Sequence, residues 1–336
     1  MSASENPLVI EITRGTMVES VHRGAYAVVD DQQVVISSVG NIERPIYARS
    51  AVKPLQALPL VETGAADRWQ LSDSELALAC GSHSAEPRHV ETILAWMAKS
   101  QLDERNLGCG PQLPLSMGAR DELARQNRKA RRIYHNCSGK HTGFLSTATH
   151  LEEPVTGYLA PEHPVQQRVK QVLTDMTGGN LDDAPTGVDG CGAPVIGIPL
   201  RYLALAMARY GTTEKLPDRR ITAAQRLYQA MVRQPLMVAG TGRWCTRVME
   251  MTVGQLAVKG GAEGVYCAIV PARRIGIALK IDDGASRAAE ALMGVLLERY
   301  AGLDPELSVK IRKLALPEIL NALGEKVGKT CHTISS

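Results

Sequence analysis

The chain has 336 residues, of which 44% are hydrophobic and 22% charged, and its formal net charge is +3. This is the composition of a soluble globular protein, and so small a charge argues against nucleic acid as the main partner. We find no apolar run of about 18 residues that predicts a membrane span, and the segment Met1–Pro7 lacks the pattern of a signal peptide. Seven cysteines, an odd number in a long chain, do not form a disulfide framework, so we expect a cytoplasmic location.

Short β-branched runs near both ends of the chain predict strands. Polar turn residues at 30–33 and at 271–274 each separate two such runs, which predicts two β-hairpins. The predicted strands cover residues 8–12, 25–29, 34–39, 264–270 and 275–281.

The middle of the chain has helical periodicity. After Pro87, apolar residues recur at helical spacing to about Lys99, and His163-Pro164 opens another such segment that Gly178 ends. Further helices are predicted at about 198–210, 218–233 and 285–300.

Strands at both ends around a helical middle predict an α+β fold, with one antiparallel sheet completed by both termini and flanked by helices. We expect a single catalytic domain over residues 1–336 with a helical middle subdomain, because no low-complexity linker or internal repeat interrupts the chain. The alternative is two domains joined near 151–156 or 212–218.

Ser50 stands three residues before Lys53, in a stretch that runs from an extended segment into a predicted helix. Residues three apart share one helix face, so the lysine amine can reach the serine hydroxyl and take its proton. A lysine acts as such a base only when its pKa falls from about 10.4 toward neutrality. A helix cap followed by a solvated lysine explains the same residues without chemistry.

Three other small-residue segments stand at predicted loops or strand entrances. Cys80-Gly81-Ser82-His83-Ser84 places two hydroxyls and an imidazole before a helix, either as a second nucleophile and substrate cradle or as a capped turn. Asn136-Cys137-Ser138-Gly139-Lys140-His141 and Val188-Asp189-Gly190-Cys191-Gly192 each hold one cysteine, so sulfur and nitrogen donors could meet at a zinc ion. Their spacing is no zinc-finger pattern, and two buried thiols are the simpler interpretation.

Lys259 lies in the segment Lys259-Gly260-Gly261-Ala262-Glu263-Gly264, directly before the second predicted hairpin. A lysine at a strand entrance can point into a pocket, although a surface lysine fits the pattern as well. Taken together and in this order, the five segments resemble the successive motifs of the asparaginase II family, the Rhizobium etli-type L-asparaginases. The resemblance spans roughly residues 10–285.

This resemblance implies hydrolysis of L-asparagine to L-aspartate and ammonia, in a fold similar to serine β-lactamases and the glutaminases built like them. It implies two serine–lysine pairs, Ser50 with Lys53 and Ser82 with Lys259, and a zinc site. We expect Ser50 to form the acyl-enzyme with Lys53 as its base, although the roles of the two serines can be reversed. The zinc ligands implied are Cys137, Lys140 and Cys191, and the implied substrate contacts are Arg49, His83, Asp189 and His141.

The family resemblance also implies a homodimer. Glutaminase activity is the main alternative, because one methylene of substrate is worth only about 1–3 kcal/mol in a pocket. Another serine amidohydrolase is a second alternative, and a zinc-bound binding protein without catalysis is the third.

Overall fold

The computed structural model describes residues 5–212 and 216–334. Contacts divide the chain into two compact units: the first comprises Met1–Ala51, Ile198–Thr212 and Val258–Ser336, and the second Val52–Gly197 and Thr213–Ala257. The single catalytic domain expected over 1–336 stays a prediction. Part of the amino-terminal segment in which we expected no signal peptide, and part of the alternative linker at 212–218, lie outside the described residues.

The first unit is built on a sheet that has eight strands within the described residues, and their order in the sheet differs from their order in the chain. The strand order is β10-β11-β1-β2-β9-β8-β7, and β3 pairs with β2. The strands are β1 (Leu8–Arg14), β2 (Met17–Asp30), β3 (Val35–Val39), β7 (Ala257–Gly260), β8 (Val265–Val270), β9 (Ile275–Ile281), β10 (Glu318–Leu320) and β11 (Lys326–His332). The same unit holds the short strand β4 (Pro45–Tyr47).

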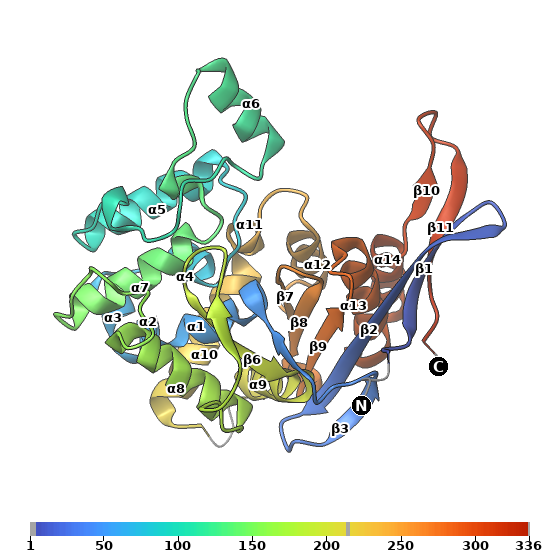
Figure 1. Ribbon diagram of the computed structural model, residues 1–336, viewed down its shortest axis with the longest axis horizontal. Helices are drawn as coiled ribbons and strands as arrows, with labels where there is room; N and C mark the ends of the chain where they lie inside the picture. The colour runs from blue at the N-terminus through green and yellow to red at the C-terminus, as the bar shows by residue number, and fades with distance from the viewer. Residues whose placement is uncertain (1–4, 213–215, 335–336) are drawn as a thin grey trace. The chain divides into compact units, whose positions relative to one another are not determined.

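The two ends of the chain lie side by side in this sheet, where Figure 1 draws them in blue and red. β1 pairs antiparallel with β11, with Ile12 opposite Thr330, and both predicted hairpins form. The expected α+β fold with a sheet completed by both termini is therefore confirmed. Strands β10 and β11 were not predicted individually, because the polar sequence of β11 becomes a strand through pairing with β1, and the short β10 pairs in turn with β11.

Helices cover both faces of the centre of this sheet, since every residue of β8 is buried. They are α9 (Leu200–Thr212) and α13 (Ser286–Tyr300), and α14 (Pro305–Ala315) packs on α13. Helix α9 packs on β2, β8 and β9, and α13 packs on β8 and β9. Gly276 permits the approach of α9, because a Cβ there would overlap the carbonyl oxygen of Ala204.

The second unit is mainly helical, as the periodicity predicts. The helices are α1 (Lys53–Gln56), α2 (Leu58–Glu62), α3 (Ala65–Arg68), α4 (Asp73–Ala79), α5 (Pro87–Lys99), α6 (Met117–Arg125), α7 (Ser138–His150), α8 (Pro164–Thr177), α10 (Asp218–Arg233), α11 (Pro235–Val238) and α12 (Trp244–Thr252). Two short strands, β5 (Thr186–Val188) and β6 (Pro194–Pro199), pair antiparallel with Gly187 opposite Val195. No helix in 5–212 or 216–334 has the length and apolar character needed to cross a membrane.

Helix α7 is the buried centre of the second unit, with residues 138–148 all buried. Its first turn crosses the end of α4 so closely that a Cβ on Gly139 would lie 2.5 Å from the carbonyl oxygen of Leu78. Glycine is therefore required at position 139. This crossing sets the start of α7 beside the segment that follows α4, where Ser82 lies.

Candidate active site

The amine of Lys53 lies at the end of α4. Its Nζ donates hydrogen bonds of 2.6 Å to the carbonyl oxygen of Gly81 and 2.9 Å to Oγ of Ser82. Lys53 is only 1% exposed, whereas Ser82 is half-buried. A buried amine thus contacts a hydroxyl that solvent or a small ligand can reach, which is the arrangement required to move a proton to or from a serine.

The segment from Gly81 to Glu86, called the Ser82 segment below, is bound along its length to residues 236–241. The backbone N–H of Ser82 donates to the carbonyl oxygen of Val238 at 2.7 Å, and Oγ of Ser84 donates to that of Ala239 at 2.8 Å. A Cβ on Gly81 would lie 2.8 Å from the carbonyl oxygen of Met237, so glycine permits this approach. These bonds fix the backbone on which Ser82 stands.

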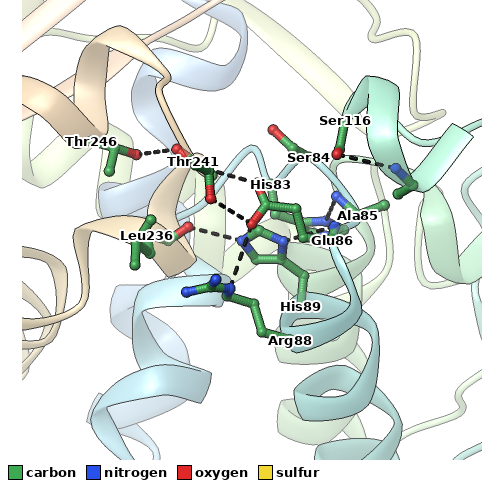
Figure 2. Close-up of polar contacts among 12 residues, drawn as sticks. His83, Ser84, Ala85, Glu86, Arg88, His89, Ser116, Leu236, Thr241 and Thr246 are labelled. Carbon is green, nitrogen blue, oxygen red and sulfur yellow. Dashed lines mark hydrogen bonds and ion pairs between the residues drawn. The ribbon is translucent and has the colours of Figure 1, made fainter.

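The carboxylate of Glu86 completes this attachment by binding Thr241, and we call this pair the clamp (Figure 2). Glu86, which is 8% exposed, accepts hydrogen bonds from the backbone N–H of Thr241 at 2.7 Å and from its Oγ1 at 2.9 Å. The guanidinium of Arg88 lies 3.5 Å from the same carboxylate. Gly240 has a φ of 128°, and a Cβ there would lie 2.6 Å from Oγ of Ser84, so both the conformation and the space require glycine.

Two buried histidines flank the Ser82 segment as neutral rings. Nδ1 of His89 accepts the backbone N–H of Glu86, so its Nε2 donates to the carbonyl oxygen of Leu236. Nδ1 of His83 likewise accepts from Ala85, and its Nε2 donates to Oγ of Ser138 at 2.9 Å. Burial lowers the pKa of both imidazoles, that of His83 far below its usual range.

His83 thereby links the Ser82 segment to the first turn of α7. It is 0% exposed, and both its ring nitrogens bind protein atoms. Its predicted contact with substrate stays a prediction, while the observed contacts are those of a residue that positions its neighbours.

Cys137, Lys140 and Cys191 meet in the second unit, each at most 4% exposed. Nζ of Lys140 lies 3.1 Å from Sγ of Cys191. Cys191 stands in a tight turn in which the N–H of Gly192 donates to the carbonyl oxygen of Asp189 at 2.8 Å. The three residues come from two separate segments, as the sequence motifs predicted.

Electrostatics in this cluster favour one thiolate and one ammonium. The hydrogen bond from Cys191 and the charge of Lys53 hold the pKa of the Cys137 thiol well below its usual range. That same hydrogen bond, together with burial, raises the pKa of Cys191. Burial opposes the charge on Lys140, but the sulfurs of Cys137 and Cys191 outweigh it and raise the pKa of the amine.

Two sulfurs and one nitrogen are donor types that zinc accepts, so Cys137, Lys140 and Cys191 would be the residues to hold such an ion. Within residues 5–212 and 216–334 no group of three or more His, Cys, Asp or Glu side chains could hold a metal ion. The candidate set therefore depends on Lys140 as its third donor. The donor types fit zinc, and ligation would require Lys140 and Cys191 to lose their protons.

His141 follows Lys140 and is 0% exposed. Its Nδ1 lies 2.6 Å from the hydroxyl of Tyr158, which also accepts the backbone N–H of Gly108 at 2.7 Å. Burial and the charge of Lys140 lower the pKa of His141 well below its usual range. Its Nε2 is buried and has no hydrogen-bond partner among the described residues.

Each unit has a cavity, and the cavity of the first unit includes a predicted site residue, Arg49. In the second unit a cavity of about 740 Å³ lies along the Ser82 segment and is lined by Ser84, Glu86, Pro87, Arg88, Leu115, Ser116, Met117, Thr241 and Arg243. In the first unit a cavity of about 730 Å³ includes Arg49, Lys280 and Glu263 in its lining. Burial lowers the pKa of Lys280.

The remaining predicted site residues belong to the first unit. Ser50 is half-buried in the 3-10 helix Arg49–Val52, which runs directly into α1. Arg49 has a φ of 51°, a left-handed conformation that is uncommon for residues with a side chain and often marks functional positions. Lys259 is 4% exposed in β7, and its Nζ donates to the carbonyl oxygen of Gly260 at 2.6 Å.

The second unit thus brings together Lys53, Ser82, Cys137, Lys140 and Cys191, with His83, His141 and Asp189 in the segments that surround them. Sequence reasoning missed several residues that hold this arrangement. The Nδ1 of His135 accepts the N–H of Cys137 at 3.0 Å. The sequence could have indicated this residue, because it stands two positions before that cysteine. Glu86, Thr241 and Tyr158 carry no local pattern, since their partners are distant in sequence.

Comparison with known proteins identifies the chain at the level of its family. A family profile described as L-asparaginase II matches residues 10–331, nearly the whole chain. With the α+β fold, this match defines the chain as a hydrolase that acts on amides. The chain belongs to the L-asparaginase II family, which confirms the resemblance found in its motifs.

No curated protein matches the chain. Among solved structures it is similar to Mglu, at 14% identity and a TM-score of 0.47, over 84% of this chain and 63% of that one. It is also similar to a β-lactamase from Mycobacterium bovis, at 14% identity and a TM-score of 0.41, over 83% and 95% of the two chains. A D-alanine carboxypeptidase AmpC from Burkholderia cenocepacia gives 15% identity and a TM-score of 0.39, over 81% and 93%.

Proposed function

We propose that this protein is an L-asparaginase, which hydrolyses the side-chain amide of L-asparagine to L-aspartate and ammonia. The observation that carries the proposal is the 2.9 Å hydrogen bond between Nζ of Lys53 and Oγ of Ser82, in a chain of the L-asparaginase II family. A lysine amine in contact with a serine hydroxyl supports acyl transfer through an activated serine.

The proposed reaction starts with Ser50. Its Oγ attacks the amide carbon while Lys53 takes its proton, and the C–N bond then breaks as ammonia leaves with a proton returned through Lys53. Ser82, which accepts a hydrogen bond from Lys53, would relay that proton, with Lys259 as the partner predicted for it. Water then cleaves the ester, which releases L-aspartate and restores the serine.

A specific observation favours the reverse assignment as a second candidate. Because Lys53 contacts Ser82, Ser82 would be a nucleophile whose base is already in place. Lys53 would then serve the same role toward a different hydroxyl.

Substrate binding is proposed for Arg49, Asp189 and His141. The guanidinium of Arg49 would pair with the α-carboxylate, and the carboxylate of Asp189 with the α-ammonium. The same contacts would also accept glutamine, so glutaminase activity is the alternative.

Zinc is proposed as the resident metal, held by Cys137, Lys140 and Cys191. Bound there, the ion would supply a fixed positive charge that shapes the pocket. His141, next in sequence to Lys140, would orient these ligands or the substrate. A cytoplasmic homodimer is proposed from the family and from the cysteine content.

Trapping of the covalent intermediate tests this proposal. Wild-type protein, Ser50→Ala and Ser82→Ala are assayed for ammonia release from asparagine and glutamine, and the denatured protein is digested to locate an aspartyl ester by mass spectrometry. An ester on Ser50 supports the first assignment, and an ester on Ser82 supports the second. Absence of ammonia from both amides with the zinc-loaded wild type would refute the amidohydrolase proposal for these substrates.

A further inference from the structure

A hydrogen-bonded chain in the second unit runs from the backbone of Gly108 through Tyr158 to His141. The N–H of Gly108 donates to the Tyr158 hydroxyl at 2.7 Å, and that hydroxyl lies 2.6 Å from Nδ1 of His141. The two rings meet edge-on, with centroids 5.7 Å apart and planes at 83°. A Cβ on Gly108 would lie 2.6 Å from Leu159 and 3.0 Å from the Tyr158 hydroxyl, so glycine permits this close approach.

The direction of the hydrogen bonds follows from counting protons. Gly108 can only donate, so the tyrosine oxygen accepts there and its single proton is left for His141. If Nδ1 donated instead, the buried tyrosine O–H and the lone pair on Nε2 would both lack partners. A buried polar atom without a partner is unfavourable, since it has lost its hydrogen bond to water and gained none, so the arrangement with fewer such atoms is favoured. Tyr158 therefore donates to Nδ1, and the proton of the neutral imidazole is on Nε2.

This assignment leaves one donor over. Nε2–H of His141 is fully buried and has no partner in residues 5–212 and 216–334. The ring lies close enough to Lys140 and Cys137 for both charges to act on it. A buried donor beside this cluster, on a ring held from its other side, is arranged for an atom that the protein itself does not supply.

We propose that Tyr158 is a positioning residue: its hydroxyl holds His141 as the Nε2–H tautomer, which reserves that N–H for an oxygen atom of a bound ligand. The oxygen belongs either to a carboxylate of the bound amino acid or to a buried water molecule. Naming an amino acid as the ligand rests on the proposed function, whereas the tautomer and its cause do not.

Nitrogen-15 NMR of histidine-labelled protein tests the proposal. The chain has eight histidines, and His141→Gln assigns the signals of the ring at issue. In the wild type we expect Nδ1 of His141 to resonate as an unprotonated nitrogen and Nε2 as a protonated one. In Tyr158→Phe the Nδ1 partner is lost, so the two shifts move toward each other as the tautomers mix.

Tyr228→Phe is the matched control, because Tyr228 is also buried in the second unit and donates to the carbonyl oxygen of Gly254 at 2.9 Å. It leaves the His141 signals unchanged. A wild-type ring protonated on Nδ1 would overturn the proposal even if Tyr158→Phe does not fold, and so would a Tyr158→Phe spectrum identical to the wild type.

L-Aspartate identifies the source of the oxygen. A shift of the Nε2–H signal on addition of L-aspartate assigns the acceptor to the amino acid. An unshifted proton that exchanges slowly with solvent and contacts a long-lived water assigns it to buried water. An unshifted Nε2–H proton that exchanges rapidly and contacts no water contradicts a reserved donor. The NMR readout is independent of turnover, so it stands if the protein proves inactive on asparagine.

Discussion

Lys53 and Ser82 are 29 positions apart in the chain, yet the amine of one donates to the hydroxyl of the other at 2.9 Å. The same amine donates to the carbonyl oxygen of Gly81, so the backbone before the serine and its side chain are bound by one group. Lys53 thus contacts Ser82 directly, whereas it follows Ser50 by three residues in the sequence. In both proposed assignments, the nucleophilic serine depends on this amine.

Replacement of Lys53 by methionine keeps the length of the side chain but removes its amine. We expect kcat for asparagine to fall by a factor of about 10² to 10⁴, the range for loss of a general base. The control is Lys170→Met, the same change at a lysine of α8 that pairs with Asp182 at the surface. An ammonia assay that finds Lys53→Met as active as Lys170→Met would rule out a catalytic role for this amine.

Thr241→Val removes the hydroxyl that binds Glu86 and keeps the shape of the side chain. A hydrogen bond to a carboxylate is lost, so we expect the free energy of unfolding to fall by about 1–3 kcal/mol. The Ser82 segment should also become less well fixed, which lowers kcat. Thr241→Ser keeps the hydroxyl and should retain both properties. Urea titration of the two variants checks this, and equal stabilities would show that the clamp contributes nothing.

Gly139→Ala and Gly143→Ala make the same change one turn apart in α7. At position 139 the new Cβ meets the Leu78 carbonyl oxygen at 2.5 Å, so α7 must move away from α4. At position 143 the nearest atoms are side chains at 3.6 Å, an ordinary contact. We expect Gly139→Ala to destabilise by more than about 2 kcal/mol and Gly143→Ala to be neutral or stabilising, since alanine is the better helix former.

Thermal unfolding of both glycine variants measures the difference. A melting temperature for Gly139→Ala equal to that of Gly143→Ala would mean that α7 and α4 do not need this approach.

Stability should fall in acid because burial lowers the pKa of His83 and His89. In the unfolded chain these rings titrate near 6.5, so below about that pH the unfolded state binds more protons and is favoured. Their contribution is complete above pH 6.5 and is lost as the pH falls. We expect each ring to lower the free energy of unfolding by up to about 1.4 kcal/mol per pH unit below that point.

Urea titrations from pH 7.5 to 5 test the sign and its source. His89→Gln should show a shallower dependence on pH than the wild type. If the variant keeps the full slope, protonation of His89 is not among the causes.

Metal content distinguishes the zinc proposal from two buried thiols. Cys191→Ala should lose bound zinc and bind L-asparagine more weakly, because it removes one of three proposed ligands. Cys267→Ala, at a fully buried thiol in β8, should retain the metal. Full zinc occupancy in Cys191→Ala, measured by elemental analysis, together with unchanged affinity for asparagine, would remove the basis of the proposal.

The sequence predicted elements whose causes are local. Alternating and β-branched runs located β8 and β9, and helical spacing located α5 to its first residue, Pro87. Strand β11 escaped because Lys326–His332 has little apolar pattern and is a strand through its pairing with β1. Periodicity reports which side of an element is buried, and it does not report which distant segment covers that side.

The same limit applied to the site. Motif order gave the residues of the cysteine cluster, and the structure brings Lys140 to Cys191. Sequence spacing paired Lys53 with Ser50, whereas its contact with Ser82 arises from the end of α4 and has no counterpart in any short motif. The role of Tyr158 could not be predicted for a further reason. A single tyrosine in a loop carries no pattern, and only the structure shows that its hydroxyl lies between Gly108 and His141.

The pairing of β1 with β11 has a consequence for biosynthesis. A ribosome releases β1 first and β11 last among the strands of this sheet, so β1 must wait for all the others before that pairing can form. The residues from Lys53 to Thr241 emerge well before then. Contacts so distant in sequence close slowly. The nascent chain would therefore already contain the site residues of the helical unit while the edge of β1 is still without its partner β11.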